Sequence, residues 1–407
     1  MGWGGVEMVL AMAALAMAAL ALTWQFMRWT GELSLERART LAARKELVLN
    51  LDAVTSLTPE VAGALSKQQG WLFLNGLKTL SAEAAAKLAK HGGRLYLGGL
   101  SSLSPDVAGA LATHEGWLCL DGLSTLSAEA AAELAKHGSL LSLGGLKTLS
   151  AEAAEALAKK RLWLKLDGLT TLTAESARAL ANYDDTLDLP GVRTLSTDVA
   201  AALATHRGKL CLPGLSSLSP EVAGALAGHF GALNLDGLSS LSKDSAEALA
   251  STLGELSLGG LKTLSGSLAK TLATHDGGLS LGGLTTLSLE GAAALAEHQG
   301  DLDLAGLSTL SREAAEALAT RVGFSLSLDG LSTLSTEVAE ALAKCQGEAF
   351  LSLDGLTTLT PEAAEALAPY EGNIHLHGLK TLSPKAAEAL ARHVGYRWLL
   401  TPWNKHC

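Results

Sequence analysis

The sequence predicts an α/β solenoid of about fifteen strand–turn–helix repeats, gently curved, with one parallel sheet face and one helical face. The first observation is a 23-residue unit, of which residues 95–117 (LYLGGLSSLSPDVAGALATHEGW) are a clean copy. The second is a glycine that precedes the third apolar residue of each unit. It recurs every 23 residues at Gly76, Gly99, Gly122, Gly145, Gly168, Gly191, Gly214, Gly237, Gly260, Gly283 and Gly306, and then at Gly330, Gly355 and Gly378. Such a period indicates a solenoid, in which each unit buries its apolar face against its neighbours.

Each unit begins with a short strand and a turn. Leu95 and Leu97 alternate with Tyr96, which is the two-residue period of a strand. Gly99 follows where the backbone must turn tightly or approach a neighbouring repeat. We therefore expect the strands to stack as a parallel sheet, with the leucines inward and the residues that flank them outward.

The second half of each unit carries the signals of a helix of about ten residues. Ser104 is an N-cap candidate, and its slot holds Ser or Thr in all fifteen copies. Val107, Ala108 and Leu111 form an apolar stripe at helical spacing, which would face the strands. Gly116 follows the last turn, as expected of a C-terminal cap.

Histidine recurs in one slot near the predicted helix end. The positions are His91, His114, His137, His206, His229, His275, His298 and His393. In other copies the same slot holds Lys, Tyr, Thr, Arg or Cys, a mixture that a metal array would not tolerate. We expect these histidines to serve the helix end.

The pattern changes at both ends of the chain. Four segments are expected: a hydrophobic membrane anchor or signal segment at 1–30, an N-terminal capping helix at 31–46, the repeat solenoid at 47–395 and a C-terminal cap at 396–407. Only the helical half of the repeat is recognisable in 31–46, as expected of a cap that shields the open core.

Residues 8–27 are apolar apart from one Thr and one Gln, and they are numerous enough to span a bilayer as a helix. Trp24 and Trp29 suit an interfacial belt, and the basic residues from Arg28 to Lys45 favour repeats on the cytoplasmic side. This predicts a single-pass membrane anchor. The alternatives are a cleaved signal peptide, which would place the repeats outside the cell, and a buried capping helix.

The pattern L-x-L…L, with one strand and one helix per unit, resembles the leucine-rich-repeat family in a divergent bacterial variant. The resemblance covers residues 31–400. It departs where the family carries Asn or Cys, because this position holds Leu77, Leu100 and Leu123, so no asparagine ladder is expected. The resemblance implies a domain that binds other macromolecules through its exposed sheet face.

The copies differ most at the outward positions of the predicted sheet. Large aromatic and basic side chains gather in the first five outward pairs, and later pairs are mostly small and polar. The candidate partner-binding residues are Trp71, Phe73, Arg94, Tyr96, Trp117, Trp163 and Lys165. Exposed aromatic and basic groups usually mark a contact site, which predicts a scaffold with a protein partner.

The same sequence leaves several other functions open. Stacked rings can hold a glycan, or the chain can be a structural spacer or an accessory subunit of a membrane complex. The rings can also simply shield the sheet, or the N-terminal segment can cover them. The basic run at 159–161 suits an anionic partner or lipid headgroups, although a solvated helix end is the favoured interpretation.

Charge and motifs argue against other classes of protein. A net charge of −10 disfavours a nucleic-acid binder. The sequence has no P-loop, nucleophile elbow or HExxH motif, so we expect neither an enzyme nor a cofactor. The four cysteines lack zinc-site spacing and are expected to be free thiols. His375 and His377 face the same way on one predicted strand, but they lack a third ligand, and no metal site is predicted.

Overall fold

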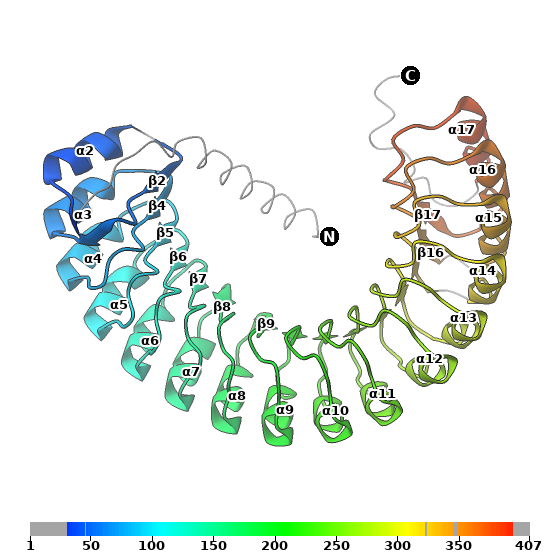
Figure 1. Ribbon diagram of the computed structural model, residues 1–407, viewed down its shortest axis with the longest axis horizontal. Coiled ribbons are helices and arrows are strands. Elements are labelled where there is room, and N and C mark those ends of the chain that lie inside the picture. The colour runs from blue at the N-terminus through cyan, green and yellow to red at the C-terminus, as the bar shows by residue number, and fades with distance from the viewer. Residues whose placement is uncertain (1–30, 45, 322–323, 346–348, 394–407) are drawn as a thin grey trace. The chain divides into compact units, whose positions relative to one another are not determined.

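The computed structural model describes residues 31–44, 46–321, 324–345 and 349–393. The predicted anchor at 8–27 and the predicted cap at 396–407 lie outside the described residues. Within the described residues, no helix is long and apolar enough to cross a bilayer. The chain divides between Leu169 and Thr170 into two units, and each is a run of strand–turn–helix repeats (Figure 1).

The first unit contains a six-stranded parallel sheet, a small two-stranded sheet and a layer of helices. Its strands are β1 (Gly31–Glu32), β2 (Val48–Asn50), β3 (Val54–Ser56), β4 (Trp71–Phe73), β5 (Leu95–Tyr96), β6 (Leu118–Cys119), β7 (Leu141–Ser142) and β8 (Leu164–Lys165). Its helices are α2 (Leu35–Ala43), α3 (Pro59–Leu65), α4 (Ala82–Leu88), α5 (Pro105–Ala112), α6 (Ala128–Leu134) and α7 (Ala151–Ala158). The larger sheet follows chain order from β2 to β8, whereas β3 pairs with β1.

The second unit repeats the arrangement around a nine-stranded parallel sheet in chain order. Its strands are β9 (Leu187–Asp188), β10 (Leu210–Cys211), β11 (Leu233–Asn234), β12 (Leu256–Ser257), β13 (Leu279–Ser280), β14 (Leu302–Asp303), β15 (Leu326–Ser327), β16 (Phe350–Ser352) and β17 (Asn373–His375). Its helices are α8 (Ala174–Leu180), α9 (Thr197–Leu203), α10 (Pro220–Leu226), α11 (Lys243–Leu249), α12 (Gly266–Leu272), α13 (Leu289–Ala296), α14 (Arg312–Leu318), α15 (Thr336–Leu342), α16 (Pro361–Leu367) and α17 (Pro384–Leu390).

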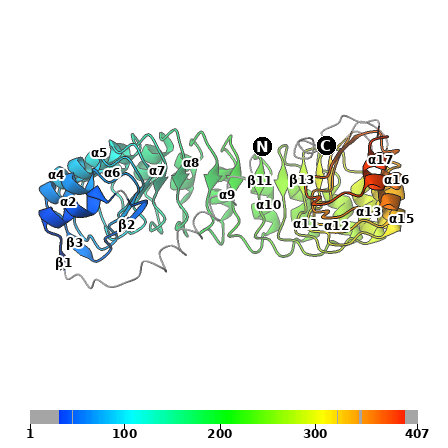
Figure 2. The ribbon, with the colours of Figure 1, turned by 90° about the horizontal axis from the view of Figure 1, so that it is seen from above.

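The repeat period sets the strand register. Leu72 pairs with Leu95, and Leu95 pairs with Leu118, so equivalent residues of successive copies lie side by side. Leu72, Leu74 and Leu77 are fully buried between the strand layer and the helices. In each unit the helices cover one side of the strands (Figure 1). The repeats of each unit follow one another in chain order (Figure 2). The predicted solenoid with leucine-rich-repeat-like units is confirmed.

The helices begin as predicted and end early. In every described helix the N-cap Ser or Thr side chain accepts a backbone N–H of the first turn, as Ser81 does from Ala84 at 3.2 Å. Most helices span seven or eight residues rather than ten. The reason is that the chain tightens after the last α turn, where the His91 N–H reaches the Leu88 carbonyl oxygen at 2.9 Å, a three-residue step.

The glycine after the helix has a different role from the predicted C-terminal cap. Thr113 is the C-cap of α5 and has right-handed backbone geometry. At Gly116, a Cβ atom would collide with the carbonyl oxygen of Gly93 in the preceding repeat. Gly99 is equivalent in this respect, because a Cβ atom there would collide with the Asn75 and Leu77 carbonyl oxygens. Close approach of the preceding repeat therefore favours glycine at both positions, although the next three copies hold Ser139, Leu162 and Asp185 in the slot of Gly116.

A polar ladder runs along the turns that follow the strands. The Asp52 carboxylate accepts the Asn75 N–H at 2.8 Å, and the Asn75 side-chain oxygen accepts the Gly98 N–H at 2.8 Å. Asp121 does the same for Gly144 at 2.8 Å. This ladder occupies the slot before the repeat glycine, so it is distinct from the family position at which Leu77 excludes an asparagine. The side chains of these residues therefore connect successive repeats.

The histidine slot also connects repeats. His114 Nδ1 lies 3.3 Å from the Ala89 carbonyl oxygen, and the ring is almost completely buried between those of His91 and His137. Where the slot holds Lys160, the Nζ atom donates at 2.7 Å to the carbonyl oxygens of His137 and Ser139. Arg321 and Tyr370 donate to carbonyl groups of their preceding repeats in the same way. At His114, Lys160, Arg321 and Tyr370 the slot therefore binds backbone carbonyl groups of the preceding repeat, whereas Thr252 donates to the Leu249 carbonyl oxygen of its own helix.

Candidate binding surface

The strand register arranges the outward side chains of the first unit in two columns. One column runs through Trp71, Arg94 and Trp117, which precede the first buried leucine of β4, β5 and β6. The other runs through Phe73 and Tyr96, which are register partners on β4 and β5. Backbone hydrogen bonds fix this alignment, because Leu72 N–H donates to the Arg94 oxygen and Leu95 N–H to the Trp117 oxygen, each at 2.8 Å.

Arg94 lies between two indole rings. Its guanidinium carbon is 4.4 Å from the centre of the Trp71 ring and 3.4 Å from that of Trp117. Both distances are within the range of cation–π attraction, worth about 0.5–1 kcal/mol per contact at exposed sites and about 2 kcal/mol when desolvated. The three half-buried side chains therefore form one stack across three strands.

The second column is also stacked. The Phe73 and Tyr96 rings are nearly parallel, at 5°, with their centres 4.1 Å apart, and Trp71 contacts Tyr96 at 6.4 Å. Burial raises the pKa of the Tyr96 hydroxyl. Next in this column is Cys119, a free thiol whose pKa burial raises to about 12. The thiol therefore stays protonated and unreactive at neutral pH.

Trp163 and Lys165 lie further along the same sheet, on and beside β8. The intervening strand β7 carries only Leu140 and Ser142 at the outward positions. Lys165 pairs with Asp167 at 3.3 Å, and Trp163 is 57% exposed. Thus the structure brings five of the seven predicted residues into one contacting cluster, Trp71, Phe73, Arg94, Tyr96 and Trp117, which we call the Arg94 cluster. Trp163 and Lys165 lie on the same face, but no contact between described residues joins them to the Arg94 cluster in one common site.

Trp163 has an unusual backbone. Its φ angle is +28°, the sole positive value among the non-glycine residues that the structure describes. A bulky residue in this region is strained by roughly 1–3 kcal/mol. Its neighbour Leu162 is 46% exposed. The residue type does not predict this strain, because Trp71 and Trp117 occupy the same outward position in other copies.

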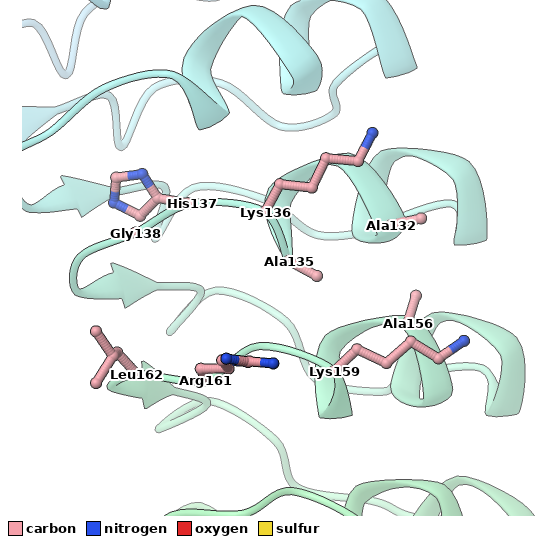
Figure 3. A pocket seen from close by; sticks show the side chains of 9 residues that line it. All are labelled: Ala132, Ala135, Lys136, His137, Gly138, Ala156, Lys159, Arg161 and Leu162. Carbon is pink, nitrogen blue, oxygen red and sulfur yellow. The ribbon is translucent and has the colours of Figure 1, made fainter.

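A shallow hollow of about 560 Å³ lies beside the ends of α6 and α7 (Figure 3). Alanines and Leu162 line it, together with Lys136, Lys159 and Arg161. Lys136 pairs with Glu133 at 2.7 Å, and Lys159 pairs with Glu155 at 3.3 Å. Charge at this hollow is therefore partly neutralised.

The basic run at 159–161 is not a continuous basic surface. Lys160 is buried, donates both of its described hydrogen bonds to backbone carbonyl groups, and has its pKa lowered to about 8 by burial. The interpretation as a solvated helix end fits Lys159 and Arg161, and it is wrong for Lys160.

In the second unit, Asp354 lies beside His375 and His377, the two histidines for which the sequence showed no third metal ligand. His375 and His377 approach Asp354, and one potential ligand atom from each lies within 4.8 Å of the others. Asp354 occupies the same repeat slot as His377, one copy earlier, so aligning the copies would have placed it beside the pair.

Comparisons with known proteins add little to this architecture. No family model and no curated protein matches the chain. Among solved structures, an internalin from Listeria monocytogenes is 13% identical, with 90% of each chain covered and a TM-score of 0.30. Toll, in the Toll–Spatzle complex of Drosophila, is 15% identical over 81% of this chain and 42% of its own, with a TM-score of 0.37. Likeness at this level carries no argument about function.

Proposed function

We propose that the chain is a non-enzymatic scaffold that binds a protein partner through the Arg94 cluster on the sheet face of its first unit. The observation that carries the proposal is the stack of Trp71, Arg94 and Trp117 across three strands. Tryptophan, tyrosine and arginine are the residues that most often dominate the binding energy of protein interfaces. Here the fold holds all three types in one contacting group before any partner arrives.

Preorganisation is the physical advantage of this surface. Ordering a rotamer-rich side chain on binding costs about 0.5–1.5 kcal/mol. The guanidinium of Arg94 is already held between two rings, and Phe73 already stacks on Tyr96. A partner therefore meets a surface whose largest side chains lose little further freedom.

The test uses substitutions that the repeat itself supplies. Thr186 fills the Trp slot in another copy, so Trp71→Thr and Trp117→Thr together remove the cluster and introduce a residue that the fold accepts. We expect recovery of the partner in a pull-down from the native source to fall at least about tenfold, which corresponds to 1.4 kcal/mol. Unchanged recovery would show that this face is not the contact.

Phe350 provides the matched control. It occupies the same slot on β16, is 44% exposed, and lies outside the Arg94 cluster. Phe350→Thr removes an aromatic ring, more exposed than Trp71 and Trp117, from the same fold position, and we expect it to leave partner recovery unchanged. A loss equal to that of the double variant would point to a general effect on the solenoid.

Glycan binding is the competing use of an aromatic face. A sugar needs an uncovered ring face, and stacking already covers one face of each ring in the Phe73–Tyr96 pair. Trp163 is the most exposed of the candidate rings. Titration with soluble oligosaccharides, followed by tryptophan fluorescence, separates this function from protein binding. If both that titration and the tryptophan variants are silent, the chain is better explained as a structural spacer or accessory subunit.

We also propose that residues 8–27 tether the repeats to a membrane as a single-pass anchor, with the repeats on the cytoplasmic side. The support is the length of the apolar run and the basic residues that follow it. Membrane fractionation combined with protease accessibility in intact cells tests both the anchor and its orientation. Soluble repeats, or repeats that external protease digests, would contradict the proposal.

A further inference from the structure

We propose that Asp354, His375 and His377 form a binding site for a divalent transition-metal ion of the Zn²⁺ class at the last described strand of the second unit. The site is independent of the Arg94 cluster. Two imidazoles and one carboxylate are a ligand set that Zn²⁺, Ni²⁺, Co²⁺ and Cu²⁺ accept, whereas Mg²⁺ and Ca²⁺ prefer oxygen ligands alone.

The distances suit one ion. The three ligand atoms lie within 4.8 Å of one another. Around a tetrahedral Zn²⁺ ion, bonds of about 2.1 Å place two ligand atoms about 3.4 Å apart. The ligand atoms must therefore approach one another by up to about 1.4 Å, a movement within reach of side-chain rotation at the half-buried His375 and the exposed His377. Three protein ligands also leave a coordination position for water or for a partner's side chain.

Hydrogen bonds hold both the carboxylate and the backbone of Asp354. The Oδ1 atom accepts the His377 backbone N–H at 2.7 Å, and the Asp354 backbone N–H donates to Asp329 at 2.8 Å. The Oδ2 atom remains 3.2 Å from His377 Nδ1, so the two ligands already face each other. Such supporting hydrogen bonds fix the orientation of metal ligands.

The two imidazoles differ from the histidines of the repeat slot. His114 is almost completely buried against backbone, whereas His375 is half-buried and His377 is exposed. The His375 ring lies between Phe350, at 5.5 Å, and His377, at 5.3 Å, and both neighbours meet it edge-on. This packing restricts the His375 ring and leaves the ligand group open to solvent.

The repeat supplies variants that should fold. The His375 slot holds Ser327 and Ser352 in the two preceding copies, and the His377 slot holds Gly in four others. The double variant His375→Ser and His377→Gly therefore removes both imidazoles with residues that the fold already uses. Asp354→Asn retains the acceptor for the His377 N–H, as Asn75 does for Gly98, and removes the charge.

The experiment titrates the full chain with Zn²⁺ by calorimetry and with Co²⁺ by visible absorption, and circular dichroism verifies folding of each variant. We expect one saturable ion in the wild type that the double variant loses, and an affinity at least about tenfold lower in Asp354→Asn, since even outer-shell changes cost 10–100-fold. His393→Tyr is the matched control, because Tyr370 fills the same buried slot, and we expect unchanged binding.

Three results would overturn the site. The first is absence of saturable binding by the wild type, which would leave only an ion pair between His377 and Asp354. The second is binding by the folded double variant equal to that of the wild type. The third is an unchanged affinity in Asp354→Asn, which would remove the carboxylate from the ligand set.

Discussion

At the scale of single residues, Arg94 shows how a side chain acquires a role from its neighbours. The guanidinium carbon lies over the Trp71 ring, at 4.4 Å, and over the Trp117 ring, at 3.4 Å. An ammonium group has no plane to match an indole ring, so lysine is a poor replacement at a stacked position. The contribution of Arg94 therefore depends on shape as well as on charge.

We expect Arg94→Lys to destabilise the first unit by about 1 kcal/mol, because it keeps the charge and loses planar stacking on two rings. Urea unfolding followed by tryptophan fluorescence measures this change. Lys209→Ala is the control, since Lys209 fills the same slot beside Thr186 and Ala232, and its effect should stay within about 0.5 kcal/mol. Equal effects from the two substitutions would mean that the stack adds nothing to stability.

The candidate residues could be predicted from the sequence, but their grouping could not. The two-residue strand period placed Trp71, Phe73 and Tyr96 outward, and the structure confirms that they line one face. The contacts between these side chains depend on their rotamers and on the smaller residues Leu140 and Ser142 that separate Trp117 from Trp163. The repeat period predicts neither. Asp354 was overlooked for a related reason, since the two histidines share one strand and the third ligand comes from the preceding copy.

At the scale of elements, Asp and Asn side chains join one turn to the next in the copies that carry them. Asp121 accepts both the Gly144 N–H, at 2.8 Å, and the Ser142 hydroxyl, at 2.6 Å. These bonds connect the turn after β6 to the end of β7 and to the turn that follows it. Helix boundaries were predictable at the N-terminus from Ser and Thr caps, and less so at the C-terminus, where contacts with the preceding repeat decide the last turn.

We expect Asp121→Ala to destabilise the first unit by about 1–3 kcal/mol, because it leaves the Gly144 N–H without its acceptor. Asp121→Asn should cost much less, since Asn75 performs the same role two copies earlier. Thermal or urea unfolding of the two variants measures the difference. If the alanine and asparagine variants unfold alike, the ladder is not a source of stability.

At the scale of the whole molecule, the buried histidines make stability depend on pH. Burial lowers the pKa of His91, His114, His137, His229 and His298. His114 faces His91 and His137, and His137 also lies beside Lys160. The rings of this run are therefore surrounded by groups that disfavour a further positive charge.

The direction of the pH effect follows from the two states. The unfolded chain binds protons at the ordinary histidine pKa, near 6.5, and the folded chain resists them. The stability is complete above about pH 6.5 and decreases as the pH falls below that value. We expect the urea midpoint to be lower at pH 5.5 than at pH 7.5. The substitution His114→Tyr introduces the residue that Tyr370 provides in the same slot of another copy, and we expect it to reduce this difference. A midpoint that is equal at the two pH values would contradict the prediction.

The in-register pairing of Leu72, Leu95 and Leu118 makes the chain extensible in steps of one strand. A further 23-residue copy inserted after β7 would move Trp163 about 4.8 Å away from Trp117 and leave the stack of Trp71, Arg94 and Trp117 intact. A partner that touches only the stack would tolerate such an insertion, and one that also reaches Trp163 would not. The repeat thus acts as a molecular ruler, on which the length of a partner's footprint can be measured by adding units.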